Sequence, residues 1–150
     1  MADLRPILLV EDNPKDLELT LAALAKCQLA NQIVIARDGE EALDYIHQTG
    51  VHADRDPGDP AVVLLDLKLP KIDGLEVLER IKGDAAHRQV PVVMLTSSRE
   101  ERDLVRSYEL GVNAFVVKPV DFNRFFEAIQ DLGMFWAILN EPPPRGVHAR

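Results

Sequence analysis

Five short apolar runs, separated by longer stretches, constrain the fold of this chain more than any other feature. They occupy residues 7–10, 33–36, 61–65, 92–95 and 114–117. Runs this short and this apolar are typical of parallel strands that are buried on both faces of a sheet. The stretches between them repeat apolar residues at helical spacing, as Leu17, Leu21 and Leu24 do after the first run. The alternation predicts a doubly wound α/β fold with a five-stranded parallel sheet and five helices.

Capping residues mark where several of these helices begin and end. Asn13 or Asp12 can cap the helix that follows the first run. Ser97 or Ser98, each with a glutamate three residues later, forms a capping box that predicts a fourth helix ending at Gly111.

Composition and charge limit the function classes that are open to the chain. Its 150 residues favour a single domain, and its net charge of -8 argues against non-specific binding of nucleic acid. The apolar runs are far too short to span a membrane, and acidic residues in and beside the first run argue against a signal peptide. Cys27 is the only cysteine, so no internal disulfide can form. We therefore expect one cytoplasmic domain.

Polar side chains follow four of the five apolar runs. Glu11 and Asp12 follow the first run, Asp66 the third, Thr96 the fourth and Lys118 the fifth. Because parallel strands point the same way, these ends should meet at the sheet edge where ligands bind in open α/β folds. Oxygen ligands without histidine or thiolate select a hard cation, preferably Mg²⁺, and an aspartate there can attack phosphorus. The pattern predicts a site for Mg²⁺ and a phosphoryl group, with Lys118 and Thr96 binding phosphoryl oxygens.

Each of these residues also has a simpler interpretation when it is taken alone. Asp12 can cap a helix, Lys118 can be a solvated surface lysine, and Thr96 is a common strand residue. Asp66 is harder to explain, because a charge after five apolar residues needs a partner or an opening to solvent. The simpler interpretations together require independent coincidences on four strands, which favours the joint site.

Four motifs carry a family resemblance: VEDNP, LLDLKLPKIDGLEVL, MLTSS and AFVVKP, in this order and spacing. From about Pro6 to Leu139 the chain resembles the receiver domain of two-component response regulators. The resemblance implies a flavodoxin-like sheet of order 2-1-3-4-5, a receiver domain over 1–139 and a proline-rich tail over 140–150. It also implies that a histidine kinase is the partner and Asp66 the phosphoacceptor.

The resemblance assigns roles to the remaining strand-end residues. It implies a Mg²⁺ site built from three carboxylates and one main-chain carbonyl, those of Glu11, Asp12, Asp66 and Lys68 respectively. Lys118 resembles the phosphoryl-binding lysine, usually followed by a cis peptide bond to proline, here Pro119. Thr96 and Phe115 resemble a switch pair, in which Thr96 moves toward the phosphoryl group, Phe115 turns inward, and the surface of the fourth helix, fifth strand and fifth helix changes. The alternative is that Phe115 is a permanent part of the core.

Two other functions stay open at this point. An aspartate-nucleophile phosphatase of the haloacid dehalogenase type needs a second acid two residues after the nucleophile, and Lys68 occupies that position. A degenerate receiver that acts only by contact is disfavoured, because the set of acids, threonine and lysine is complete. We therefore expect self-directed phosphotransfer and autodephosphorylation rather than an enzyme with an external substrate.

The end of the chain suggests how a signal would leave. Only eleven residues follow Leu139, too few to fold alone, so we expect output by binding. The last helix has one core-facing apolar stripe and further apolar residues at its end, which predict homodimerisation through the last helix and the fifth strand. The interface candidates are Phe122, Met134, Phe135, Trp136, Ile138 and Leu139. A proline tail folded back over this patch is the alternative.

A more specific resemblance concerns the loop 48–60 and the ending FWAILNEPPP. Both resemble the single-domain regulators that are paired with bacterial and cyanobacterial phytochrome histidine kinases. The four histidines, at positions 47, 52, 87 and 148, are interpreted as solvated residues without a role, and a metal site beside the loop is the disfavoured alternative.

Overall fold

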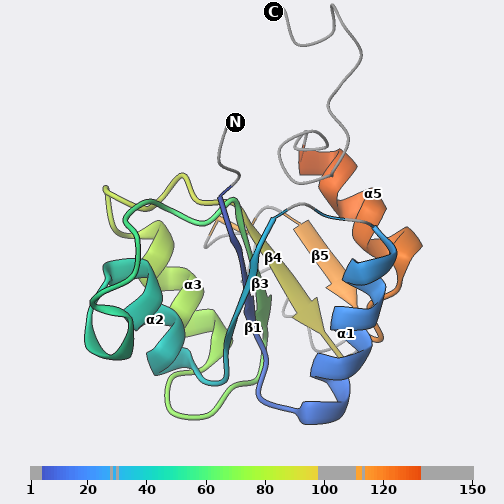
Figure 1. Cartoon of the computed structure of the whole chain (residues 1–150), viewed down its shortest axis with the longest axis horizontal. Helices are drawn as coiled ribbons and strands as arrows, with labels where there is room; N and C mark the ends of the chain where they lie inside the picture. Colours follow the sequence, from blue (N-terminus) through green and yellow to red (C-terminus); the bar gives the residue numbers. More distant parts are fainter. Residues whose placement is uncertain (1–4, 28, 30, 98–110, 113, 133–150) are drawn as a thin grey trace, which may run out of the picture.

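The computed structural model describes residues 5–27, 29, 31–97, 111–112 and 114–132 (Figure 1). Its elements in chain order are β1 (Ile7–Val10), α1 (Pro14–Lys26), β2 (Ile33–Ala36), α2 (Gly39–His47), the 3-10 helix η1 (Gly50–His52), β3 (Val62–Asp66), α3 (Gly74–Lys82), β4 (Val92–Thr96), β5 (Ala114–Val117) and α5 (Phe122–Leu132). The fourth helix that the sequence predicts before Gly111 falls on 98–110, outside the described residues.

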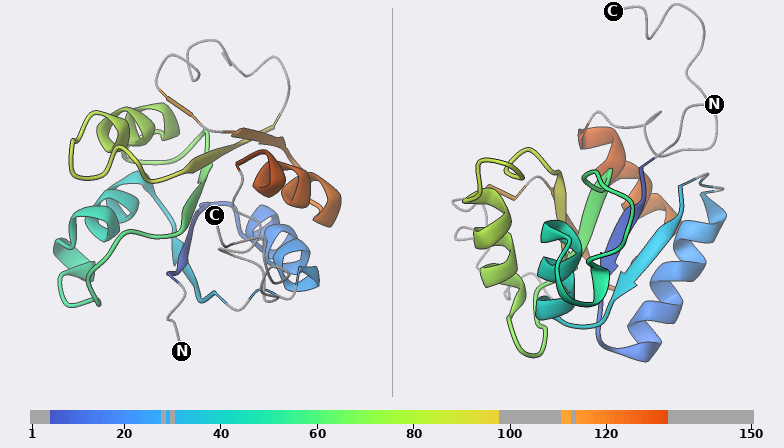
Figure 2. Two further views of the ribbon diagram at one scale, coloured as in Figure 1. Left: turned by 90° about the horizontal axis from the view of Figure 1, so that it is seen from above. Right: turned by 60° about the vertical axis from the view of Figure 1, so that its left-hand side comes forward.

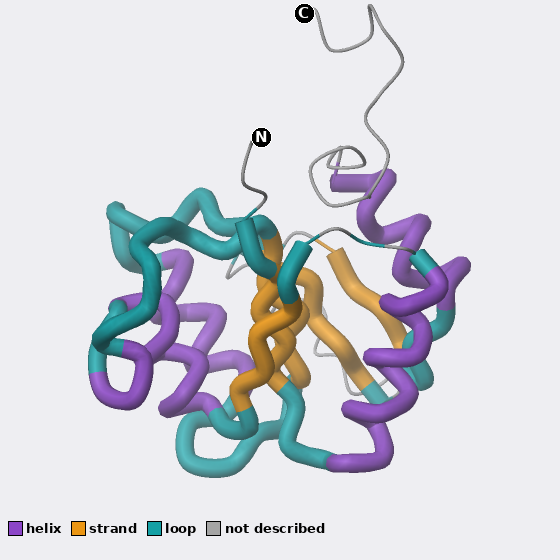
Figure 3. The backbone as a smooth tube through the Cα atoms, viewed as in Figure 1, coloured by secondary structure: helices purple, strands orange, loops and turns teal. Residues whose placement is uncertain are grey.

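The five strands form one parallel sheet in the order β2-β1-β3-β4-β5, which confirms the predicted order. Figure 3 shows the strands side by side between the helices. The predicted ends of β3 and β4, at residues 65 and 95, were each one residue short. The ladder continues past them, because the amide of Leu67 donates to Leu95 O at 3.0 Å and that of Lys118 donates to Thr96 O at 2.7 Å. Asp66 and Thr96 are therefore the last residues of their strands.

Helices cover both faces of the sheet, and Figure 2 shows these layers from two further directions. Alternation along β1 directs Leu9 toward the face covered by α1 and α5, and Leu8 toward the face covered by α2 and α3. Both leucines are fully buried, and each such side chain stabilises the fold by about 1.5–3 kcal/mol. Within the described ranges, no helix has both the length and the apolar composition needed to cross a membrane.

Caps fix the start of the helices at the carboxyl edge of the sheet. The side-chain oxygen of Asn13 accepts from the amides of Lys15 at 2.9 Å and Asp16 at 3.0 Å, so Asn13, not Asp12, is the α1 cap. Because Asn13 caps the helix, the Asp12 carboxylate does not take part in the cap and lies beside the end of β1.

The loop between β3 and α3 returns tightly to the end of its strand. The amide of Gly74 donates to Leu67 O at 3.0 Å. A Cβ atom at Gly74 would collide with the carbonyl oxygen of Asp66 and lie 2.7 Å from that of Leu67. The absence of a side chain at Gly74 thus permits the close contact that holds the loop beside Asp66.

Candidate functional site

The polar residues predicted at the strand ends meet at one edge of the sheet. Asp66 and Thr96 end the neighbouring strands β3 and β4, whereas Glu11 and Lys118 directly follow β1 and β5. Continuous parallel register across these four strands brings the residues to the same level. The sheet topology therefore assembles the predicted group from segments that are far apart in the chain.

Lys118 lies at the centre of a charge network. Its Nζ is 2.8 Å from Glu11 Oε1, 3.0 Å from Asp16 Oδ2 and 3.1 Å from Asp66 Oδ1. The contact with Glu11 has the length of a hydrogen bond but not its alignment, which leaves Glu11 Oε1 without a hydrogen-bond donor among the described residues. Glu11 is completely buried, and the Asp66 side chain is 7% exposed. One ammonium group thus faces three carboxylates, two of them buried.

This environment shifts the protonation of both central groups. Burial and the neighbouring Glu11 carboxylate raise the pKa of Asp66 to about 7, although Lys118 opposes the shift. Burial would lower the pKa of Lys118, but its close contact with Glu11 and the charge of Asp66 outweigh burial and raise that pKa. Lys118 therefore stays charged at neutral pH, whereas the raised pKa of Asp66 favours its protonated form more than usual when no further cation is bound.

Three carboxylates at this edge form a suitable set of ligands for a metal ion. One oxygen from each of Glu11, Asp12 and Asp66 lies within 4.8 Å of the others, and Asp12 is exposed to solvent. Oxygen ligands of this kind fit Mg²⁺ or Mn²⁺, and a divalent cation would offset the surplus negative charge around Lys118. Glu11 Oε1, which accepts no hydrogen bond from the described residues, also fits a cation. The part that the sequence assigned to the Lys68 carbonyl stays a prediction.

Thr96 carries a buried hydroxyl that has no hydrogen-bond partner among the described residues. The residue is only 1% exposed, and a buried hydroxyl without a partner costs about 1–3 kcal/mol. Such a group is well explained if it donates to a ligand. Phe115, the other member of the predicted switch, is half-buried and packs against the core on the α2 and α3 face. Its movement stays a prediction.

The edge has two further features, a cis peptide bond and a contact between Asp16 and Lys118. The peptide bond between Lys118 and Pro119 is cis, as the family resemblance implied. The Asp16 contact with Lys118 was missed, although the position of Asp16 in the first turn of α1, just after the Asn13 cap, was a usable signal.

The predicted interface lies mostly outside the described residues. Phe122 is half-buried, and its ring stacks on Phe126 with centroids 5.5 Å apart, against the core. The remaining candidates fall outside the described part of the chain: Met134, Phe135, Trp136, Ile138 and Leu139.

Known proteins resemble this chain in both sequence and structure. The family model for the response regulator receiver domain matches residues 7–130. The response regulator Rcp1 of Synechocystis sp. is 39% identical over 130 residues, which are 87% of this chain and 87% of that protein. A crystal structure of the Mn²⁺-bound form of Rcp1 has a TM-score of 0.73 at 36% identity, covering 93% of this chain and 99% of the other.

Two further solved structures are those of phytochrome response regulators. The bacteriophytochrome response regulator AtBRR has a TM-score of 0.86 at 76% identity, covering 93% of this chain and 100% of the other. The phosphorylated cyanobacterial phytochrome response regulator RcpA has a TM-score of 0.73 at 40% identity, covering 90% and 94% respectively. With the sheet order and the residues at its carboxyl edge, these similarities show that the chain belongs to the response regulator receiver domain family.

Proposed function

We propose that this chain accepts a phosphoryl group from a histidine kinase on Asp66. The Asp66 carboxylate attacks the phosphorus of phosphohistidine, a new O–P bond forms, and the P–N bond breaks. The imidazole of the kinase leaves with the electron pair of that bond and takes up a proton. The observation that carries the proposal is the buried Asp66 carboxylate with Lys118 Nζ at 3.1 Å from its Oδ1.

The other residues of the edge have defined parts in this reaction. Lys118 keeps its charge and neutralises a phosphoryl oxygen, and the Thr96 hydroxyl donates to another. Glu11, Asp12 and Asp66 would hold Mg²⁺ together with the Lys68 carbonyl, and the Mn²⁺-bound form of Rcp1 supports a divalent cation in a relative. When bound, Mg²⁺ supplies positive charge that favours the ionised carboxylate and offsets the charge on phosphorus oxygens.

Self-directed chemistry suits this chain better than turnover of an external ester. Asp66 is followed two residues later by Lys68, so that position offers no second acid for acid–base catalysis. The aspartyl phosphate is instead hydrolysed on the same chain. We assign the receiver to residues 1–139 and a tail to 140–150, and place the reaction in the cytoplasm.

Phosphoryl acceptance by purified protein tests the proposal. The intact mass should show one added phosphoryl group when kinase or a small phosphoryl donor is supplied with Mg²⁺, and none in chelator. Asp66→Asn should accept none, whereas the exposed Asp121→Asn control should behave as wild type. Phosphorylation of Asp66→Asn, or steady hydrolysis of a phosphate ester, would overturn the assignment. A wild type that accepts no phosphate would favour the contact-only receiver.

We further infer that the kinase is of the phytochrome type. AtBRR and RcpA are both described as phytochrome response regulators, and their similarity extends over at least 90% of this chain. Phosphotransfer from a bacteriophytochrome kinase should be much faster than transfer from an unrelated histidine kinase at equal concentration. Equal rates would contradict the pairing while leaving the assignment of Asp66 intact.

A further inference from the structure

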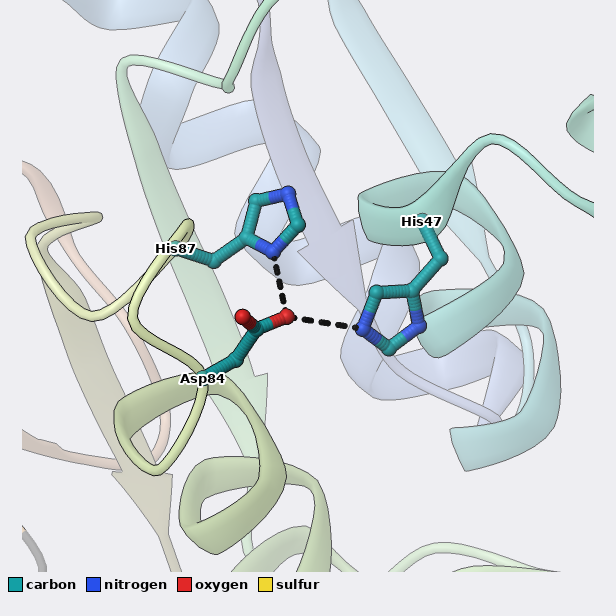
Figure 4. A group of neighbouring side chains, drawn as sticks. All are labelled: His47, Asp84 and His87. Carbon is teal, nitrogen blue, oxygen red and sulfur yellow. Dashed lines mark hydrogen bonds and ion pairs between the residues drawn. The ribbon is translucent and has the colours of Figure 1, made fainter.

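A second group of metal-binding side chains lies away from the carboxyl edge. His47 is the last residue of α2, and Asp84 and His87 lie between α3 and β4 (Figure 4). One ligand atom from each lies within 4.8 Å of the others. Helices of a doubly wound fold run antiparallel to its parallel strands, so the ends of α2 and α3 lie near the amino edge. The group is therefore at the end of the sheet opposite to Asp66.

Both imidazole rings are directed at the same carboxylate oxygen. Asp84 Oδ2 is 2.8 Å from His87 Nδ1 and 3.5 Å from His47 Nε2, as Figure 4 shows. A tetrahedral Zn²⁺ with bonds of about 2.0–2.1 Å places its ligand atoms roughly 3.3 Å apart, between these two distances. The side chains of His47 and Asp84 are 37% and 35% exposed, which leaves room for water as a further ligand.

The backbone around Asp84 holds its carboxylate in this orientation. Its other oxygen, Oδ1, accepts from the amide of Ala86 at 3.0 Å. Its main-chain carbonyl accepts from the amides of His87 at 2.9 Å and Arg88 at 2.8 Å. The turn therefore occupies Oδ1 and the carbonyl, while Oδ2 faces the two imidazoles.

A second carboxylate, that of Asp59, faces the other ring nitrogen of His87. Asp59 Oδ1 is 3.7 Å from His87 Nε2, the ring nitrogen on the far side from Asp84. Metal-bound histidines usually direct their free N–H at such a carboxylate, which fixes the tautomer and raises the basicity of the ligand nitrogen. At 3.7 Å Asp59 lies just beyond hydrogen-bond distance, on the side from which it would support a metal-bound His87.

We propose that His47 Nε2, Asp84 Oδ2 and His87 Nδ1 bind one Zn²⁺ ion. Two imidazole nitrogens with one carboxylate favour zinc over Mg²⁺, which prefers oxygen ligands only. The bound ion joins the end of α2 to the turn that precedes β4. The simpler alternative is a pair of histidine–aspartate contacts that bind no metal.

Zinc titration of the metal-free protein in saturating Mg²⁺ tests the proposal, because Mg²⁺ then competes at the carboxyl edge. Calorimetry should give one Zn²⁺ per chain, with binding more than about tenfold weaker in His47→Ala and in Asp84→Asn. His52→Ala is the matched control, because His52 pairs with Glu41 at 3.1 Å, outside the cluster, and it should bind zinc as wild type does. Asp66→Asn should also bind zinc normally, which separates this proposal from the phosphoacceptor site.

A spectroscopic readout supports the titration. Co²⁺ in place of Zn²⁺ should give visible absorption of a four-coordinate site, and this absorption should disappear in His47→Ala. Circular dichroism in chelator should show that this exposed substitution leaves the fold intact. Absence of zinc binding, or equal binding by wild type, His47→Ala and Asp84→Asn, would overturn the proposal.

Discussion

At the scale of single residues, Asp66 is buried and is repelled by the neighbouring Glu11 carboxylate. Its pKa of about 7 lies well above that of an aspartate in an unfolded chain, about 3.9. Between these values the folded protein keeps a proton that the unfolded chain has released. The stabilising contribution is therefore fully present below about pH 4 and is lost as the pH rises through 7. At pH 8 without a metal ion, the ionised Asp66 lowers the free energy of unfolding.

Asp66→Asn should therefore stabilise the metal-free protein at pH 8. We expect the free energy of unfolding to rise by about 1–3 kcal/mol, because the amide avoids burial of a second negative charge beside Glu11. The gain should become smaller at pH 5, where the wild-type side chain is protonated when folded. Urea unfolding in chelator at both pH values measures the change. A gain equally large at pH 5, or none at pH 8, would contradict the raised pKa.

Lys118→Met should have the opposite effect at the same edge. It leaves the buried carboxylates of Glu11 and Asp66 without their shared counter-charge, and the loss of one partner of a buried pair costs about 3–5 kcal/mol. Added Mg²⁺ should recover part of this loss, since a bound cation replaces the missing charge. Urea unfolding with and without Mg²⁺ tests this, with the exposed Lys15→Met as control. A Lys118→Met protein as stable as that control would show that the network is not needed.

At the scale of elements, the contact between the β3–α3 loop and the end of β3 holds Asp66 in place. Gly74→Ala should destabilise the protein by about 1–3 kcal/mol, because its Cβ atom meets backbone oxygens that cannot move without displacing Asp66. It should also weaken Mg²⁺ binding. Gly83→Ala is the control, because Gly83 has φ of -82° and its Cβ atom would meet Glu79 O at 3.0 Å. Thermal melts with a Mg²⁺ titration compare the two, and equal effects would contradict the role of the loop.

The sequence predicted those elements whose signal is local. Continuous apolar runs located the strands, and their shared direction placed Asp66 with Thr96. The sequence offered two caps for α1, Asn13 and Asp12, and the backbone at the start of α1 places the side chain of Asn13 on the free amides. The Asp16 contact with Lys118 depends on how α1 packs against the sheet edge. Likewise, His47 and His87 were interpreted as solvated, because only the fold brings α2 beside the turn after α3.

At the scale of the whole molecule, we propose that one surface of the receiver passes on the change at Asp66. We expect homodimers through the region of α5 and β5, detected by light scattering at micromolar concentrations with and without phosphoryl donor. Phe135→Ser should give monomers, because it removes an apolar side chain from the predicted interface. Leu19→Ser, on the half-exposed Leu19 of α1, is the matched control and should leave dimers intact. A wild-type monomer under both conditions would contradict this expectation.

We propose that four strand ends form one phosphoryl site around Asp66. A crystal structure with Mg²⁺ and beryllofluoride, a tetrahedral mimic of a phosphoryl group on a carboxylate, tests it most directly. We predict beryllium on an Asp66 oxygen, the cation on Glu11, Asp12 and Asp66, and fluoride contacts from Thr96 Oγ1 and Lys118 Nζ. Beryllofluoride on another residue, or a cation away from the three carboxylates, would contradict the claim.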